Sequence, residues 1–379
     1  MRIGIEAQHI FKNKKKSNDF VVLEFIRYLQ EIDYENEYFI FVRPAIDRCL
    51  GETANFRIVD IPAAPSYIWE QIYLPEAALL EKCDVLHCTG IIAPVFSKVP
   101  IITTVHDIAM LERILFFEKR NTLPKKMDNV YIRYVLPKVI RKSKRIIAYS
   151  NIQRVKIAEY FKFDINKITI IEKGISNIFH KITDIDHISK IRKKYHLPER
   201  FIYIIGLSGS IKEIKTIVAA FTGITNDISN PIMLVLDAKL NTQVKLNAHF
   251  LTNPSKSLIT VLKSPIKADL PAIYNMSDCV INISDKEEAA FGILEIMACE
   301  TPVISIKSDT IVEITGKAIE LTDISNPVMI IEAINRILHD TKYSHNLNQL
   351  AKNQVAQYTW QGMTGNIIKI YEQVVANRQ

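Results

Sequence analysis

The run Phe201-Ile202-Tyr203-Ile204-Ile205-Gly206 gives the clearest indication of architecture in the chain. An unbroken series of isoleucine and aromatic residues is typical of a strand that is buried on both faces of a parallel sheet. A buried helical segment could look the same over so short a distance, but the glycine that follows favours a strand ending in a turn.

Similar short apolar runs recur on both sides of this stretch, with helical stretches between them, which predicts alternating β and α units that form parallel sheets. Strands are expected at Arg2 to Ala7, Tyr38 to Val42, Arg57 to Ile61, Asp84 to His87, Ile101 to Val105, Arg145 to Tyr149, Ile168 to Glu172, Phe201 to Ile205, Ile232 to Leu236, Leu258 to Leu262, Cys279 to Ile283 and Pro302 to Ile306. The predicted fold class is α/β, with two doubly wound, Rossmann-like domains.

The length of 379 residues also argues for two domains, because a single core usually stops growing at about 250–300 residues. The polar and charged segment from His180 to Arg200, which contains Pro198, is expected to separate a domain over residues 1–180 from one over residues 195–358. Asp184-Ile185-Asp186 could be read as a metal-binding carboxylate pair, but its place in a linker favours surface acids.

Composition points to a folded protein of the cytoplasm. Hydrophobic residues make up 48% and charged residues 23%, which is ordinary globular usage. The longest apolar runs fall short of the roughly 18–20 residues that span a bilayer, and Met1 to Glu6 lacks the apolar core of a signal peptide. The five scattered cysteines are expected to be buried thiols in a reducing compartment.

The net charge of +7 lies mostly in the first half of the chain, and its basic residues are densest between Lys119 and Lys173. Such a surface attracts phosphate groups, lipid head groups or nucleic acid, although solvated lysines on helix faces explain much of the same pattern. Nucleic acid is the weakest of these partners, because the basic segment lacks interleaved exposed aromatic residues.

Candidate ligand-binding residues follow the strands, since open parallel sheets bind ligands at the carboxyl ends of their strands. The loop after Ala7 contains Lys14, Lys15, Lys16 and Ser17 but no Gly-x-Gly, which removes the main support for a dinucleotide oxidoreductase. Its lysines could bind phosphate or could simply be solvated.

Two histidines stand at predicted strand ends. His106, followed by Asp107, and His87 could each exchange a hydrogen bond with a ligand oxygen near neutral pH. A structural role in a turn is the alternative for both residues.

The loop from Gly206 to Lys212 leads into a predicted helix. Backbone amides of its Ser-Gly-Ser turn and the helix N-terminus can bind an anion, and Lys212 can offset the charge of a departing phosphate. The motif alone is weakly specific.

The most informative stretch runs from Ser284 to Cys299. It places Glu287 in a loop and Glu295, with seven residues between them, about one turn into a helix, so that both could face one extended ligand. Carboxylates suit sugar hydroxyls because they accept two or more strong hydrogen bonds. An acidic helix start stabilised by the macrodipole would explain Glu287 but not Glu295 among apolar neighbours.

Together with other motifs in the same order, this stretch resembles the retaining GT-B glycosyltransferases of glycosyltransferase family 4. The resemblance is carried by the two glutamates with Met297 to Ile304, by Glu313-Ile314-Thr315-Gly316, His106-Asp107, Tyr149-Ser150 and the opening Met1 to Ala7. It implies a GT-B fold with a deep interdomain cleft, an N-terminal acceptor domain, a C-terminal donor domain and a helix over residues 362–379 that returns to the first domain.

The resemblance also implies roles for individual residues. Glu287 would contact the donor sugar, Glu295 the ribose, Lys212 the diphosphate, and His106 would lie beside the reacting sugar. The expected catalytic residues are His106, Lys212 and Glu287. The expected donor-binding residues are Gly206, Ser208, Ser210, Lys212, Glu287, Phe291, Gly292, Ile293 and Glu295, and the expected acceptor-side residues are Lys15, Lys16, Ser17, His87 and Ser150.

Some positions depart from the family pattern. Leu207 and Ile211 stand where a second basic residue is usual, and Ala289-Ala290 precede Phe291-Gly292, which normally follows the first glutamate more closely. A catalytically weak or inactive relative that serves as a partner subunit is therefore the alternative. A sugar-nucleotide epimerase is a further alternative with less support.

The predicted function is that of a retaining, metal-independent glycosyltransferase of hexosyltransferase type. Its donor would be a nucleotide diphosphate sugar and its acceptor a glycan or lipid-linked sugar in cell-surface polysaccharide or glycolipid synthesis. No cofactor or metal beyond the donor substrate is expected. The basic first domain would allow peripheral contact with anionic membrane at the inner face.

Overall fold

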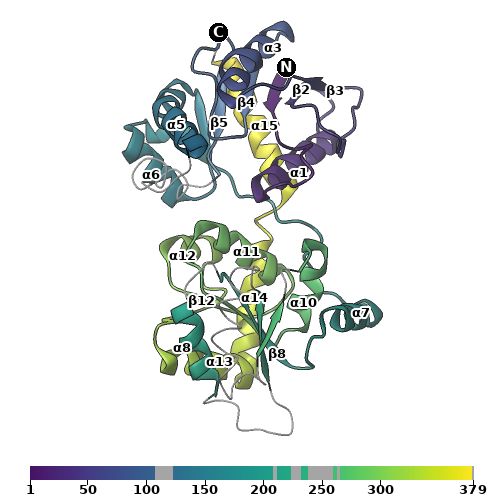
Figure 1. Ribbon diagram of the computed structural model, residues 1–379, viewed down its shortest axis with the longest axis vertical. Coiled ribbons are helices and arrows are strands. Elements are labelled where there is room, and N and C mark those ends of the chain that lie inside the picture. The colour runs from purple at the N-terminus through teal and green to yellow at the C-terminus, as the bar shows by residue number, and fades with distance from the viewer. Residues whose placement is uncertain (107–122, 208–210, 223–231, 238–258, 263–264, 378–379) are drawn as a thin grey trace. The chain divides into compact units, whose positions relative to one another are not determined.

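The computed structural model describes residues 1–106, 123–207, 211–222, 232–237, 259–262 and 265–377 (Figure 1). The chain divides into two units, one formed by Met1–Gly174 with Tyr358–Gln379 and the other by Ile175–Gln357. Each unit is built on its own parallel sheet, which confirms the predicted α/β class.

The first unit has a parallel sheet with strand order β3-β2-β1-β4-β5-β6-β7. Its strands are β1 (Arg2–Glu6), β2 (Glu37–Val42), β3 (Phe56–Asp60), β4 (Val85–Cys88), β5 (Ile101–Thr104), β6 (Arg145–Ala148) and β7 (Ile168–Ile170). The middle strands β1, β4 and β5 are buried almost throughout, as their runs of isoleucine, valine and leucine require.

Helices of the first unit connect these strands and include the end of the chain. They are α1 (Ser17–Ile32), α2 (Ser66–Ile68), the π-helical segment η1 (Trp69–Tyr73), α3 (Leu74–Leu80), α5 (Leu123–Lys142), α6 (Asn151–Phe161), the 3-10 turn η3 (Ile165–Lys167) and α15 (Trp360–Ala376). Helix α15 packs beside α1 and β4 and buries Tyr371 completely, so the C-terminal segment is part of this unit's core.

The second unit repeats the same arrangement with strand order β10-β9-β8-β11-β12-β13. Its strands are β8 (Phe201–Ile205), β9 (Met233–Asp237), β10 (Ile259–Leu262), β11 (Cys279–Asn282), β12 (Val303–Ile306) and β13 (Glu320–Thr322). Its helices are α7 (Ile185–Tyr195), α8 (Ile211–Thr222), η5 (Lys267–Asp269), α10 (Leu270–Met276), α11 (Glu287–Ala298), α12 (Asp309–Thr315), α13 (Pro327–His339) and α14 (Thr341–Val355).

The segment expected to be a linker is largely helical. Residues 185–195 form α7, which packs against α10 within the second unit. The Asp184 side chain caps this helix by accepting a hydrogen bond of 3.0 Å from the His187 amide. Asp184 therefore has a structural role at a helix start, where carboxylates are favoured by the orphan amides and the macrodipole.

The cysteines fit the expectation of free thiols, four of them buried and Cys49 half-buried. Within the described ranges, no helix is both long and apolar enough to cross a membrane.

Candidate functional site

Both sheets reverse their strand order beside the first strand of the unit, between β1 and β4 in one and between β8 and β11 in the other. Ligands of open parallel sheets bind outside the carboxyl ends of the strands at this point. The residues that follow these four strands are therefore candidate ligand-binding residues of the two units.

In the second unit, Gly206 follows β8 and Ser284 follows β11 after one further residue. A Cβ atom at position 206 would lie 2.8 Å from Cβ of Ser284 and 2.9 Å from its amide nitrogen. Gly206 also has a left-handed φ of 82°, which side chains other than glycine rarely adopt. The turn after β8 thus requires glycine, and it brings backbone close to the start of α11.

Helix α11 begins at Glu287, with Lys286 as its N-cap residue. Glu287 is only 7% exposed. Free amides and the positive end of the helix dipole at this terminus favour anionic groups of a ligand. The expectation that Glu287 lies in a loop was wrong, because Glu287 is already the first residue of the helix.

Glu295 lies on the same helix, eight residues beyond Glu287, or about 12 Å along the axis at 1.5 Å per residue. It is therefore about two turns into the helix, whereas the sequence pattern predicted one. Its Oε1 lies 3.2 Å from Nζ of Lys267, and its side chain is 25% exposed. A ligand that reaches both glutamates would have to extend along α11.

The other predicted donor residues have mixed surroundings. Phe291 and Gly292 are half-buried, whereas the Ile293 side chain is fully buried in the core and can reach a ligand only through its backbone. Ser208 and Ser210 lie outside the described residues. Lys212 is the second residue of α8, and its side chain is likewise not described.

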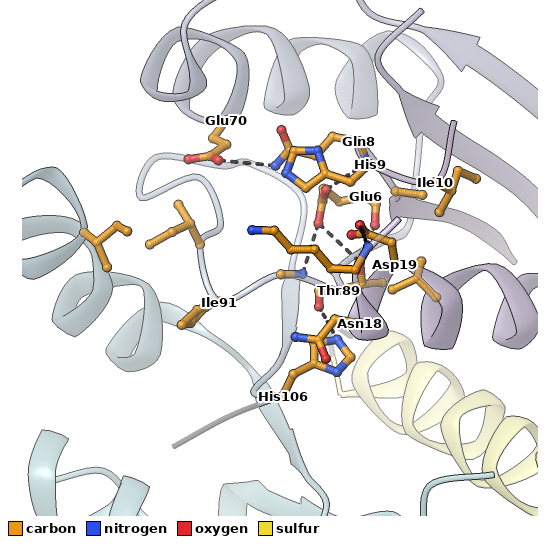
Figure 2. A pocket seen from close by; sticks show the side chains of 16 residues that line it. Glu6, Gln8, His9, Ile10, Asn18, Asp19, Glu70, Thr89, Ile91 and His106 are labelled. Carbon is orange, nitrogen blue, oxygen red and sulfur yellow. Dashed lines mark hydrogen bonds between the residues drawn. The ribbon is translucent and has the colours of Figure 1, made fainter. Parts of the chain in front are cut away.

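The first unit contains a cavity of about 300 Å³ at its own reversal point (Figure 2). Glu6 ends β1 at its floor: one carboxylate oxygen accepts from the Gln8 amide at 3.0 Å, and the other accepts from the Gly90 amide at 3.0 Å. The hydroxyl of Thr89 donates to the Glu6 carbonyl at 2.6 Å. Burial raises the pKa of the Glu6 carboxyl. Glu6 thus ties the loops after β1 and β4 together.

His106 lines the same cavity and is held by two hydrogen bonds. Its Nε2 donates to the Thr89 carbonyl at 2.7 Å, so Nδ1 carries no proton and accepts from the Tyr149 hydroxyl at 3.2 Å. Burial, aided by the nearby charge of Lys173, lowers the pKa of His106 to about 3. The imidazole is therefore neutral near pH 7 and has a fixed orientation.

Two of the predicted acceptor-side residues have structural roles instead. His87 is buried, with Nδ1 2.6 Å from the Tyr371 hydroxyl and Nε2 2.7 Å from the Thr104 hydroxyl, so both ring nitrogens are used inside the core. Ser150 is also buried, and its hydroxyl caps α6 by accepting from the Gln153 amide. Neither side chain is open to an acceptor, so these two predictions were wrong.

The predicted residues of the first loop have separate surroundings. Lys15 forms an ion pair with Asp47, whereas Lys16 is exposed, precedes α1 and lines the cavity. Ser17 is the exposed first residue of α1. Of the predicted first-domain residues, the cavity thus brings Lys16 and His106 together.

Glu70 is a lining residue that the sequence analysis did not identify. It belongs to the π-helical segment η1, a type of helix that often occurs at functional sites. Its Oε2 accepts from the Tyr131 hydroxyl at 2.9 Å, and Oε1 accepts from Nε2 of Gln8 at 3.3 Å. No local motif marks Glu70, whereas Glu6 could have been found as the polar residue that ends the first strand.

Two family models together match most of the chain. The model described as Glycosyltransferase Family 4 matches residues 20–177, and the model described as Glycosyl transferases group 1 matches residues 185–354. The two matches fall on the first and second sheet respectively.

Known proteins that resemble the chain include a glycosyltransferase and a synthase. It is 28% identical over 110 residues to D-inositol 3-phosphate glycosyltransferase of Salinispora arenicola, covering 28% of this chain and 25% of that protein. It is 24% identical over 193 residues to N-acetyl-alpha-D-glucosaminyl L-malate synthase of Bacillus anthracis, covering 49% and 48% respectively. The matches thus span between a quarter and about half of these relatives' length.

Among solved structures, HepE of Anabaena in complex with UDP-glucose has the same fold. The TM-score is 0.69 at 15% sequence identity, over 98% of this chain and 100% of that one. The chain thus has the GT-B fold, and it matches the model described as Glycosyltransferase Family 4 over residues 20–177 and the model described as Glycosyl transferases group 1 over residues 185–354.

Proposed function

We propose that the protein transfers a sugar from a nucleotide diphosphate sugar to a glycan or lipid-linked acceptor with retention of anomeric configuration. The observation that carries this proposal is the close approach of Gly206 to Ser284 beside the start of α11. It leaves backbone, rather than side chains, next to a helix N-terminus, which suits a diphosphate. Glu287 and Glu295 on that helix supply carboxylates for hydroxyl groups.

In this proposal the second unit binds the donor. Lys212 and the N-terminus of α8 stabilise the diphosphate as negative charge develops on the leaving group, and Glu295 and Glu287 accept hydrogen bonds from the ribose and the sugar. The UDP-glucose complex of HepE supports a donor of this class. A lysine and two helix dipoles would supply the positive charge, so the reaction is proposed to need no metal.

The first unit is proposed to bind the acceptor and to position its hydroxyl group. His106 is a neutral imidazole with a fixed tautomer, which suits a hydrogen bond to a sugar oxygen better than transfer of a full charge. On a retaining front-face path the leaving phosphate takes the acceptor proton. The protein then contributes mainly orientation and electrostatic stabilisation.

A lipid-linked acceptor would bring the protein to the inner face of the membrane, in cell-surface polysaccharide or glycolipid synthesis. The first unit exposes Phe96 (82%) and Tyr134 (68%). Lys142 lies 5.2 Å from the Phe96 ring centroid, and Lys138 lies 3.4 Å from that of Tyr134. Aromatic rings with adjacent cations are suited to the interface of an anionic bilayer.

One observation favours the alternative of an inactive partner subunit. Leu207, which stands where a basic residue is usual in the resembled family, is buried in the core of the second unit. Positive charge at the diphosphate would then rest largely on Lys212. Donor hydrolysis separates the two functions, because active transferases often hydrolyse their donor slowly whereas an inactive relative does not.

The proposed function is tested first by a thermal-shift screen with nucleoside diphosphates. A ligand at 100 times its dissociation constant adds about 2.7 kcal/mol to the free energy of unfolding. The matching nucleotide sugars are then incubated with the protein, and NMR follows free sugar and its anomeric form. Release of sugar with the donor's configuration supports a retaining enzyme; binding without any turnover supports the partner subunit.

A further inference from the structure

The cavity of the first unit has an acidic lining. Its described lining residues include three acids, Glu6, Asp19 and Glu70, and one cation, Lys16. Asp19 is occupied by the backbone, since its Oδ2 accepts from the Lys16 amide at 2.7 Å. The Glu6 carboxylate likewise accepts hydrogen bonds from backbone amides. Among these three acids, Glu70 is the one whose described hydrogen-bond donors are all side chains.

The side chains around Glu70 form a directed series of hydrogen bonds. Nε of Arg43 donates to Oε1 of Gln8 at 3.1 Å, which leaves the amide nitrogen of Gln8 to donate to Glu70. On the other side, Nε2 of Gln71 donates to the Tyr131 hydroxyl at 3.0 Å, and this hydroxyl donates to Glu70. Both series end on Glu70, whose oxygens each keep a second lone pair for a further donor.

The position of Glu70 makes that remaining capacity available to a ligand. Figure 2 shows Glu70 and His106 at opposite ends of the group of lining side chains, with Gln8 and His9 beside Glu70. Nδ1 of His9 is buried and has no hydrogen-bond partner within the described part of the chain. A volume of about 300 Å³ lies at the small end of ligand pockets and suits a single sugar-sized residue.

The charge of the cavity lining favours an uncharged ligand over an anionic one. A carboxylate or phosphate group would meet the acids of the lining and lose hydration without a matching set of cations. Neutral hydroxyl groups would instead donate to Glu70 and exchange hydrogen bonds with the two histidines. The Arg43 guanidinium offsets part of this negative charge, but it already donates to Gln8 and to the Ala64 carbonyl at 2.9 Å, so few of its N–H groups remain for an anionic ligand.

We propose that this cavity binds an uncharged sugar or polyol residue of the acceptor and that Glu70 is the specificity-determining residue that accepts a hydrogen bond from its hydroxyl. The inference rests on the proposed function, because it names the acceptor class for the same enzyme. It places any anionic part of the acceptor outside this cavity.

The proposal is tested by saturation-transfer NMR with monosaccharide probes on the full chain. The neutral probes are glucose, mannose, N-acetylglucosamine and myo-inositol, and the anionic probes are glucuronate and glucose 6-phosphate, all at millimolar concentration. We expect at least one neutral probe to bind and Glu70→Gln to weaken it roughly tenfold, as for loss of a charge-assisted hydrogen bond. Glu76→Gln, an exposed glutamate on α3, is the matched control and should bind as the parent protein does.

A pH series separates recognition by Glu70 from a purely structural role. Burial raises the pKa of Glu70 to about 7, against the opposing effects of Tyr131, Gln8 and Arg43 and with some help from Glu6. The carboxylate form therefore increases from pH 6 to pH 8, and binding of the neutral probe should strengthen over this range and become flat in Glu70→Gln. His9 and His106 do not titrate there, since their pKa values are lowered to about 4 and about 3.

Tyr131→Phe provides a second variant that leaves the carboxyl in place. It removes one donor to Glu70, so the pH profile should shift upward while the protein stays folded. The proposal is overturned if anionic probes bind more tightly than neutral ones, if no neutral probe binds, or if Glu70→Gln binds as well as the parent. Nucleoside diphosphate binding, measured on the same samples, reports separately on the proposed donor function of the second unit.

Discussion

Gly206 and Ser284 approach so closely that a methyl group on Gly206 would lie 2.8 Å from Cβ of Ser284. This contact joins the turns after β8 and β11 at the point where the strand order reverses. The close packing and the left-handed φ of 82° place two independent demands on the same residue.

Gly206→Ala is expected to lower the free energy of unfolding by roughly 2–4 kcal/mol, from about 1–2 for the left-handed backbone and the remainder for overpacking. Nucleoside diphosphate binding should fall with it. Urea unfolding and titration calorimetry measure the two effects. Gly365→Ala is the control, because a Cβ there meets nothing within 4 Å inside α15 and should add up to ~1 kcal/mol of stability. A Gly206 variant as stable as the parent would contradict the strained-turn interpretation.

Glu295→Ala and Glu287→Ala should have different effects on ligand binding. If Glu295 binds the ribose, its removal weakens both the free nucleoside diphosphate and the intact donor, by roughly tenfold for a lost hydrogen bond to a charged group. Removal of Glu287 should weaken the intact donor and leave the free nucleotide almost unchanged. Calorimetric titration with both ligands tests the assignment, and Glu288→Ala, which alters an exposed acid of the same helix, is the control. Equal losses for both variants with both ligands would show that the roles are assigned wrongly.

Much of this architecture could be predicted from local sequence, and the exceptions have physical reasons. The strand at Phe201–Ile205 was predicted to the residue, because its side chains are buried on both faces and the run is continuous. Strand β13 was missed, since Glu320–Thr322 is short and begins with a charged residue. That glutamate is buried because Arg336 and Tyr343, from later helices, pair with it.

The same holds for the candidate sites: residues marked by the local sequence could be predicted, whereas residues that depend on tertiary contacts could not. Gly206 directly follows β8 and His106 follows β5 after one further residue, so the rule for open sheets made both of them candidates. Glu70 instead depends on Gln8 and Tyr131, which are distant in sequence and meet it only in the folded unit. His87 was misread because a histidine at a strand end looks the same whether a ligand or the Tyr371 hydroxyl receives its hydrogen bond.

Protonation of buried histidines should make the protein less stable in mild acid. The pKa of His106 is lowered to about 3 in the folded protein and is about 6.5 in the unfolded chain, so the unfolded state binds more protons below pH 6.5. The stabilising contribution is complete above pH 6.5 and falls by about 1.4 kcal/mol per pH unit as the pH drops toward 3. His106→Gln keeps a donor and an acceptor, and it should reduce the slope of unfolding free energy against pH by about half a proton at pH 6.5, rising to about one proton at pH 5.

The comparison of parent and variant is needed because Glu70 titrates in part of the same pH range and changes the free energy of unfolding in the opposite direction. Its pKa is raised to about 7, so its contribution is lost as the pH rises. The effect of Glu70 cancels in the difference between the two proteins. Identical slopes in urea unfolding from pH 6.5 to pH 5 would mean that His106 is protonated in the folded state.

The final prediction concerns the basic surface of the first unit. The sequence pattern indicated basic residues at Lys14, Lys15 and Lys16 and between Lys119 and Lys173, but Lys15 is already paired with Asp47. Lys142 is exposed and lies next to Phe96, and its chain neighbour Arg141 is also exposed, so this region is the better candidate for contact with anionic lipid. Each basic residue near such a surface contributes up to about 1 kcal/mol.

Co-sedimentation with anionic and neutral vesicles at two salt concentrations tests this contact. Binding should require anionic lipid and weaken as salt rises, because the Debye length falls from about 10 Å at 0.1 M to about 3 Å at 1 M. The double variant Arg141→Glu with Lys142→Glu should lose most of the binding, and Phe96→Ser should lose part of it even at high salt, where apolar contact remains. Lys317→Glu with Lys342→Glu makes the same change of net charge at exposed positions of the second unit and should bind as the parent does. If both double variants lose binding equally, the net charge of the protein rather than this surface causes the binding. If binding of the parent protein depends on neither lipid charge nor salt, the lysines are only solvated side chains on the helix face and the acceptor is soluble.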